Sequence, residues 1–168
     1  TWSLESPSKG LVFQDVQPIA IHPAPAKTAL SAHVYDPKGR LKGLAARTGI
    51  AAIPVTSLSA LPKGGVLLVG PDALTESEVD RTTLAAYAAG GGRIVVLDQE
   101  RPLGGPALPV ELERTAEGTS FLFPEDPTHP ALLGLTALDL RGWAGGSGRA
   151  LWNKPARGAK SLVQDGPR

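Results

Sequence analysis

The chain has 168 residues, a length that suits one domain of ordinary size with a core of its own. Its 17 Lys and Arg nearly balance its 16 Asp and Glu, and the net charge of +1 excludes a global field that would recruit nucleic acid or an anionic membrane. It contains no cysteine, which excludes disulfides and cysteine-bound metals, and no apolar run long enough to span a membrane. We therefore expect no cofactor, no metal site, no nucleic acid partner and no membrane partner.

The first 28 residues predict an extended arm or linker. Polar and apolar residues alternate over 10–16, which is typical of a short strand. Prolines at positions 18, 23 and 25 then stiffen the chain and withhold backbone donors. We divide the chain into an arm at 1–28 and an α/β domain at 29–168.

From residue 29 the sequence repeats a strand, a turn and a helix. Asp36 and Pro37 follow the first expected strand as a helix-capping carboxylate and a first-turn proline, and Gly49 suits the left-handed end of that helix. The run at 65–70 is apolar enough to be covered on both faces. The expected strands are 31–35, 50–55, 65–70, 93–98 and 119–123; the first helix carries Leu41, Leu44 and Ala45, one helical turn lies near Leu58 and Leu61, and a short helix lies at 131–135.

The strongest local signal is a helix that begins near residue 75. Thr75 and Glu78 have the spacing of a capping box, and Leu74 and Val79 have that of a hydrophobic staple. The helix is expected to end at the glycines 90–92, and a further buried strand follows them.

Helices between apolar strands indicate parallel pairing with right-handed crossovers. We therefore predict an α/β fold with a doubly wound, mainly parallel sheet in a flavodoxin-like, three-layer α/β/α arrangement. The last residues begin a strand-like run at 160–164 and stop at a turn signal, so we expect the domain to be truncated at its C-terminus.

The candidate site residues follow the expected strands. Ligands of open parallel sheets bind outside the carboxyl ends of the strands, and Asp36, Asp72 and Asp98 are expected there. Three carboxylates at one edge could bind a divalent cation or act as general acids and bases. The same residues are common caps and turn formers, and this structural role is favoured. The candidate ligand-binding cleft comprises Asp36, Asp72, Asp98, Gln99, Glu100 and Trp143; no catalytic residue and no metal ligand is assigned.

Two of the remaining signals also have a structural interpretation. Trp143 lies in the glycine-rich loop 142–148, where its ring could stack on a sugar, although packing at the edge of the core is favoured. His129 precedes a short helix without the nucleophile motif that a general base would serve, so it too is expected to be structural. The sequence Gly70-Pro71-Asp72 matches no phosphate-binding fingerprint.

Taken together, these segments resemble the class I glutamine-amidotransferase-like superfamily. More narrowly, they are similar to the flavodoxin-like modules attached to bacterial glycoside hydrolases of the β-galactosidase kind. The similarity covers residues 29–165, and its most characteristic pieces are the Gly-Gly-Arg before a strand and the His-Pro-x-x-x-Gly-Leu helix. The segments that carry it are 35–39, 66–74, 91–97 and 128–135.

The departure from this superfamily concerns the nucleophile. Its catalytic members carry a cysteine on the sharp turn after the strand that corresponds to 94–97, where this chain has Asp98, Gln99 and Glu100. Because amide hydrolysis in that family needs the thiolate, the resemblance implies the fold without the amidotransferase reaction. It leaves enzymatic activity of the chain open, with the missing cysteine weighing against it.

The resemblance implies a non-catalytic module of a larger, secreted or periplasmic, carbohydrate-active protein. Its expected partners are neighbouring domains of a longer chain, and a second copy of the chain or a carbohydrate are alternatives. Two other functions stay open: a hydrolase with Asp98 or Glu100 as general base and Asp36 and Asp72 as ligands, and a small-molecule sensor that uses the same cleft.

Overall fold

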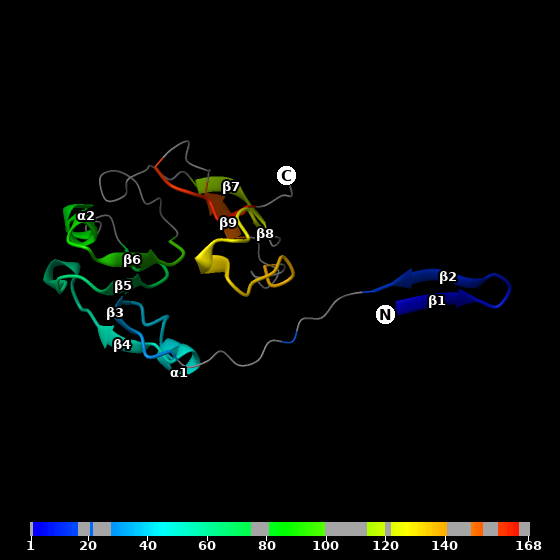
Figure 1. Ribbon diagram of the computed structural model, residues 1–168, viewed down its shortest axis with the longest axis horizontal. Coiled ribbons are helices and arrows are strands. Elements are labelled where there is room, and N and C mark those ends of the chain that lie inside the picture. The colour runs from blue at the N-terminus through cyan, green and yellow to red at the C-terminus, as the bar shows by residue number, and fades with distance from the viewer. Residues whose placement is uncertain are drawn as a thin grey trace.

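The structure of the chain is a computed structural model. It describes residues 2–16, 21, 28–74, 81–99, 114–119, 122–140, 149–152 and 158–164. At its centre is a parallel sheet, and Figure 1 shows its four strands side by side in the order β4-β3-β5-β6. These strands are β3 (Ser31–Tyr35), β4 (Ala51–Pro54), β5 (Val66–Val69) and β6 (Arg93–Val96), so the expected α/β character with a parallel sheet is confirmed.

The order of the strands reverses once along the chain. The chain runs from β3 to its neighbour β4, returns past β3 to β5 on the other side, and continues to β6. The connection from β3 to β4 and the connection from β5 to β6 therefore run in opposite directions across the sheet. In open parallel sheets such a reversal leaves a crevice at the carboxyl ends of the two strands, so the residues after β3 and β5 occupy the favoured position for a site.

The core lies between the sheet and two helical elements. Leu67 and Val69 of β5 are completely buried and share one face, since side chains alternate along a strand. Leu84 and Tyr87 of α2 (Arg81–Ala89) and Leu58 of the 3-10 helix η1 (Leu58–Ala60) pack in the same cluster. Leu68, which faces the other side, is 9% exposed, so β5 is covered on both faces as predicted.

The outer strand β6 is less buried than predicted. Ile94 and Val96 pack against the core cluster, whereas Arg93 is exposed and Val95 is 47% exposed. The prediction of a further buried strand is therefore wrong for β6, whose side chains are half-buried or exposed. The reason is its position at an edge of the described sheet, where one face lacks the cover that a central strand receives.

The first helix begins later than predicted. Residues 37–43 form turns with left-handed glycines at Gly39 and Gly43, and α1 (Leu44–Thr48) starts only after them. Leu41 therefore lies before the helix and not on its apolar face. The predicted left-handed glycine after the helix is confirmed, because Gly49 has φ 75°.

The second helix ends as predicted, at Ala89 before the three glycines. Gly91 has φ 86°, and the Gly92 N–H donates to the Tyr87 carbonyl oxygen at 2.9 Å, which reverses the chain toward β6. The capping box and the staple of this helix involve Thr75, Glu78 and Val79, which lie outside the described residues.

The later elements pair antiparallel to one another. β7 (Arg114–Thr119) pairs with β9 (Arg149–Trp152), and β8 (Phe123–Pro124) pairs with β10 (Val163–Gln164). The prediction of a fifth strand at 119–123 is wrong in its bounds, because one strand ends at Thr119 and the next begins at Phe123. The short helix predicted at 131–135 is the 3-10 helix η3 (Pro130–Leu132).

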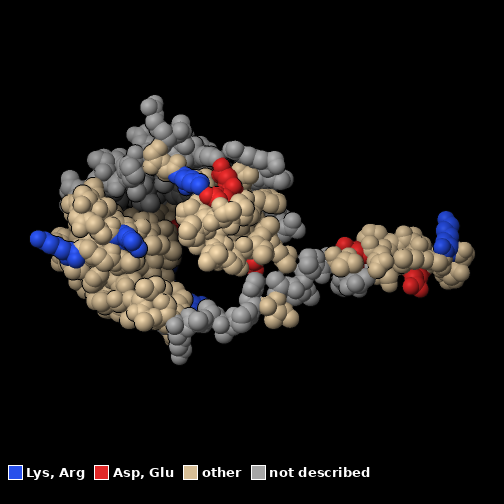
Figure 2. All heavy atoms as spheres, viewed as in Figure 1, with Lys and Arg blue, Asp and Glu red and all other residues tan. Residues whose placement is uncertain are grey.

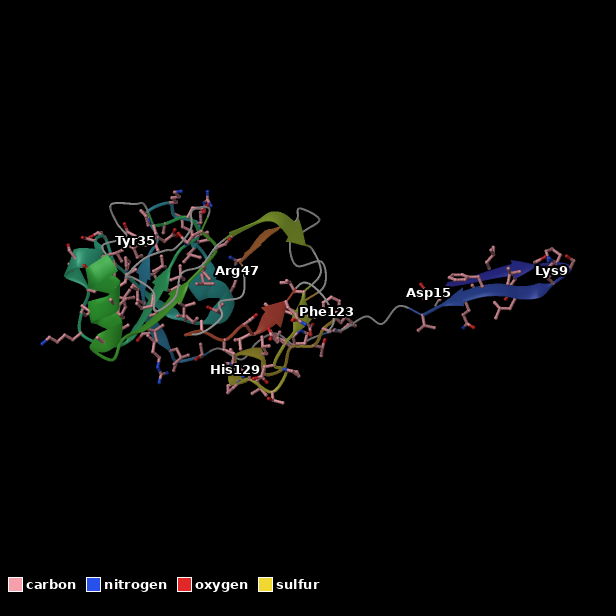
Figure 3. All side chains as sticks on the ribbon, turned by 90° about the horizontal axis from the view of Figure 1, so that it is seen from above. Lys9, Asp15, Tyr35, Arg47, Phe123 and His129 are labelled. Atoms are coloured by element: carbon pink, nitrogen blue, oxygen red, sulfur yellow. The ribbon has the colours of Figure 1, made fainter. Side chains whose placement is uncertain are left out.

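The predicted arm contains a β-hairpin. β1 (Trp2–Ser6) and β2 (Gly10–Asp15) pair antiparallel, with Leu4 opposite Phe13 and a bulge in the register between Leu4 and Glu5. Figure 1 shows the hairpin away from the sheet, and Figure 3 shows Lys9 at its tip and Asp15 where the chain leaves it. Figure 2 shows that most of its visible surface is neither acidic nor basic.

Candidate functional site

The carboxyl ends of β3, β5 and β6 meet at one edge of the sheet. The Gly70 N–H donates to the Tyr35 carbonyl oxygen at 2.9 Å, which joins the end of β5 to that of β3. The Asp72 N–H donates to the Asp98 carbonyl oxygen at 2.9 Å, which joins the loop after β5 to the segment after β6. The structure thus places Asp36, Asp72, Asp98 and Gln99 at this one edge. Glu100 and Trp143 lie outside the described residues.

Gln99 is the buried polar residue of this edge. Its side chain is 3% exposed, and every hydrogen-bonding part of its amide is engaged by the main chain. The Gln99 Nε2 donates to the carbonyl oxygens of Gly70 at 2.9 Å and Leu97 at 2.6 Å, and Oε1 accepts from the Leu74 N–H at 3.1 Å. Because buried amides need such partners, Gln99 joins the loop after β5 to the end of β6.

Asp36 supports the turns after β3. Its Oδ2 accepts a hydrogen bond from the Leu41 N–H at 2.6 Å. Its Oδ1 is buried without a hydrogen-bond partner in the part of the chain that the structure describes. This oxygen lies against the backbone of Gly70, where an added Cβ would stand 2.8 Å from it. A residue with a side chain at Gly70 would displace the carboxylate.

Asp72 has an unusual backbone conformation. The Ala73 N–H donates to the Gly70 carbonyl oxygen at 3.2 Å, which closes a turn with Pro71 and Asp72 at its centre. Asp72 has φ 49°, a value that this position of a type II turn requires and that usually selects glycine or asparagine. Its Oδ2 forms an ion pair with Arg40 Nη1, which ties the turn after β5 to the turns after β3.

The side chains of Asp36 and Asp72 are thus engaged in contacts within the fold. Asp36 binds a backbone N–H and Asp72 binds Arg40. Among the described residues, no three His, Cys, Asp or Glu lie where they could hold a metal ion together. The arrangement links three strand ends through side-chain hydrogen bonds and one ion pair.

Two participants in this edge were missed in the sequence. Gly70 follows an apolar strand and precedes a proline, a pattern that indicates a turn without revealing the close approach of Asp36. Arg40 is separated from Asp72 by 32 positions in the chain, and no local pattern identifies such a pair.

Two cavities of the described surface lie beside elements of the sheet. One, of about 570 Å³, lies between the loop 58–64 and α2, and the Tyr87 hydroxyl in its wall donates to the Gly64 carbonyl oxygen at 2.6 Å. The other, of about 470 Å³, lies at the carboxyl ends of β3 and β4, beneath the turns 37–43. The second lies beside the edge described above, since Tyr35 and Asp36 form part of its wall.

Two polar residues of the later segment have local roles. His129 Nδ1 accepts from the Ala131 N–H at 3.1 Å, which caps η3 and agrees with a structural His. The pKa of Asp126 is lowered to about 2. The largest cause is the hydrogen bond from the Lys160 ammonium to its carboxylate, and the second is the hydrogen bond from the Thr128 hydroxyl. None of the described helices is long and apolar enough to cross a membrane.

Comparison with known proteins returned no match. No protein-family model, no curated protein and no solved structure matches the chain.

Proposed function

We propose that this chain is a non-catalytic, amidotransferase-like α/β module of a larger carbohydrate-active protein, in which it packs against a neighbouring domain. The observation that carries the non-catalytic part is Gln99, whose buried amide is held by main-chain groups of Gly70, Leu74 and Leu97. This residue follows the strand after which the resembling enzymes mount their nucleophile. A buried residue that is held by three hydrogen bonds neither attacks a substrate nor leaves room for one.

The strand order supports the fold that this proposal needs. Numbered from β3, the parallel strands follow the order 2-1-3-4, which is that of the first four strands of flavodoxin-like doubly wound sheets. We propose that the chain has this doubly wound, three-layer arrangement. The association with carbohydrate-active proteins rests on the sequence resemblance.

The hairpin supports packing against a neighbouring domain. Isolated two-stranded hairpins are marginally stable in water, so one that presents apolar side chains to solvent needs a partner. On β1, β2 and the residue after them, five large apolar side chains are more than half exposed: Leu4, Leu11, Val12, Phe13 and Val16.

The size of this apolar surface favours a covalently linked partner over a second copy. Burial of the exposed parts of five such side chains contributes about 5 kcal/mol, if each contributes about half of its full burial energy. Association of two free proteins costs about 4–15 kcal/mol before any affinity appears. A domain on the same chain meets the hairpin at high effective concentration and avoids most of that cost.

Hydrogen exchange of the hairpin amides tests the packing role. We expect the amides of β1 and β2 to exchange fast in the chain alone and at least about tenfold more slowly in the longer protein, because a partner shields them and stabilises the hairpin. Leu4→Ser with Phe13→Ser should abolish this protection, whereas the control Lys9→Ser at the hairpin tip should retain it. Equal exchange in the two proteins would contradict the proposal.

Activity measurements test the non-catalytic part separately. The purified chain should release no ammonia from glutamine and cleave no glycoside. Turnover that survives purification and disappears in Asp98→Asn would overturn this part and favour the carboxylate-dependent hydrolase instead.

A further inference from the structure

The cavity of about 470 Å³ has the dimensions of a small-molecule site. It lies at the carboxyl ends of β3 and β4, and the turns 37–43 form its rim. Its volume falls in the range of pockets that hold small ligands, about 300–1,000 Å³. Its walls are largely apolar: Val34, Pro37, Leu41, Ala52, Pro54 and Val55.

The charged groups of this cavity are one ammonium and one carboxylate. The Asp36 carboxylate accepts a hydrogen bond from the Leu41 N–H and lies against Gly70. Because Gly70 follows β5, which flanks β3 on the side opposite β4, this carboxylate is turned toward the end of β5. Lys42 folds back over the rim, because its Nζ lies 3.4 Å from the position of a Cβ at Gly39. Among the described residues no carboxylate pairs with Lys42, so its ammonium is the charge available to a ligand.

Among the cations of the segment 36–48, Lys42 alone lines the cavity. Residues 36–48 contain four cations and one carboxylate, and one of the cations, Arg40, is paired with Asp72. The remaining cations Lys38 and Arg47 lie outside the cavity wall. The Thr56 hydroxyl supplies a neutral hydrogen-bonding group in the wall.

We propose that this cavity binds a small organic carboxylate with an apolar body. The Lys42 ammonium would pair with the carboxylate at the rim, and the apolar walls of β3 and β4 would cover the body of the ligand. The charge selects an anion, and the apolar walls favour one whose charge is confined to a single end. This binding site is independent of the packing role of the hairpin.

Nuclear magnetic resonance titration of the whole chain with benzoate tests the proposal. We expect saturable shifts of the amides at 39–42 and 55–56, and at least about tenfold weaker binding of the neutral analogue benzyl alcohol, which lacks the anionic group. Inorganic phosphate, which lacks an apolar body, should also bind at least about tenfold more weakly. Equal binding of benzoate and either analogue would overturn the proposal, as would an absence of shifts at these amides.

Two variants test whether the Lys42 ammonium supplies the positive charge that binds benzoate. Lys42→Gln should weaken benzoate binding about tenfold, because it removes the ammonium and keeps most of the side chain. The matched control Lys38→Gln removes a cation from the same turns outside the cavity wall and should change binding less than about twofold. Equal weakening in both variants would show a general charge effect and would overturn the role of Lys42. Both lysines are exposed, and the wild-type comparison of benzoate with benzyl alcohol decides the proposal without either variant.

Discussion

The side-chain amide of Gln99 donates to the carbonyl oxygen of Gly70 at 2.9 Å, across two strand ends that are 29 positions apart in the sequence. This bond joins the turn after β5 to the segment after β6. With the Asp72–Arg40 ion pair, it connects the carboxyl ends of three strands through side chains that lie outside the hydrophobic core. These contacts make the edge of the sheet a structural joint whose stability can be measured.

Replacement of Gln99 by Leu should destabilise the chain by about 3 kcal/mol. The substitution removes the partner of the Leu74 N–H and of the Leu97 carbonyl oxygen, and each group that loses its partner away from water costs about 1–3 kcal/mol. The Gly70 carbonyl oxygen keeps its bond from the Ala73 N–H. Urea unfolding followed by circular dichroism measures the change. Gln99→Glu is the matched control: its carboxylate would face two carbonyl oxygens and so have a raised folded-state pKa, and this variant should lose further stability as the pH rises. A Leu variant as stable as the wild type would contradict the joint.

Replacement of Gly70 by Ala should destabilise the chain through Asp36. The new Cβ would stand 2.8 Å from Asp36 Oδ1 and 3.1 Å from its Cγ, so the carboxylate must move and its bond to the Leu41 N–H is lost. We expect a cost of about 2 kcal/mol. In the double variant with Asp36→Ala, the total loss of stability should be smaller than the sum of the losses in the two single variants, because the clash with the carboxylate is absent. Strict additivity in urea unfolding would contradict this contact.

Substitutions of Asp72 should separate backbone strain from charge. Asp72→Gly relieves the left-handed φ of 49° and loses the pair with Arg40, so its net effect should lie within about 0.5 kcal/mol of zero. Asp72→Ala loses the pair and keeps the strain, and it should cost about 1–2 kcal/mol. Asp72→Asn, which tolerates this conformation, should fall between them. An Ala variant as stable as the Gly variant would show that the backbone conformation contributes nothing.

Replacement of Gly92 by Ala should disrupt the end of α2. An added Cβ would stand 2.2 Å from Tyr87 Cε1, closer than any real contact, so the buried tyrosine ring must move. We expect a cost of about 3 kcal/mol in thermal or urea unfolding. Tyr87→Phe is the control, since it removes only the bond from the hydroxyl to the Gly64 carbonyl oxygen and should cost about 1 kcal/mol. A smaller cost for Gly92→Ala than for the control would contradict the packing.

The Asp126–Lys160 ion pair should keep the Asp126 carboxylate ionised down to low pH. The lowered pKa of about 2 means that the pair favours the folded state above the ordinary carboxyl value of 3.8, and that this contribution disappears as the pH falls through about 2. An NMR titration of the Asp126 side chain should give that midpoint. Lys160→Gln should move it toward 3.8, and Thr128→Val should move it less, since the Lys160 hydrogen bond is the larger cause. A midpoint that Lys160→Gln leaves unchanged would contradict the pair.

The sequence by itself determined the strands of the parallel sheet and the left-handed glycine at position 49. Runs such as 65–70 are apolar throughout, and the burial of Leu67, Leu68 and Val69 follows from that composition. Local chemistry was less decisive for the first helix. Asp36 and Pro37 have the residue types of a helix start, but the two left-handed glycines hold the chain in turns until Leu44.

Only the tertiary structure decided which polar residues of the candidate site engage one another. Sequence reasoning placed Asp36, Asp72, Asp98 and Gln99 at one edge because parallel strands end together. Their partners Arg40, Gly70 and Leu74 depend on which strands are neighbours, and the order β4-β3-β5-β6 is a property of the packed sheet. Hydrogen bonds across 25 to 32 positions leave no periodic trace in a sequence, since they are selected by distance in space.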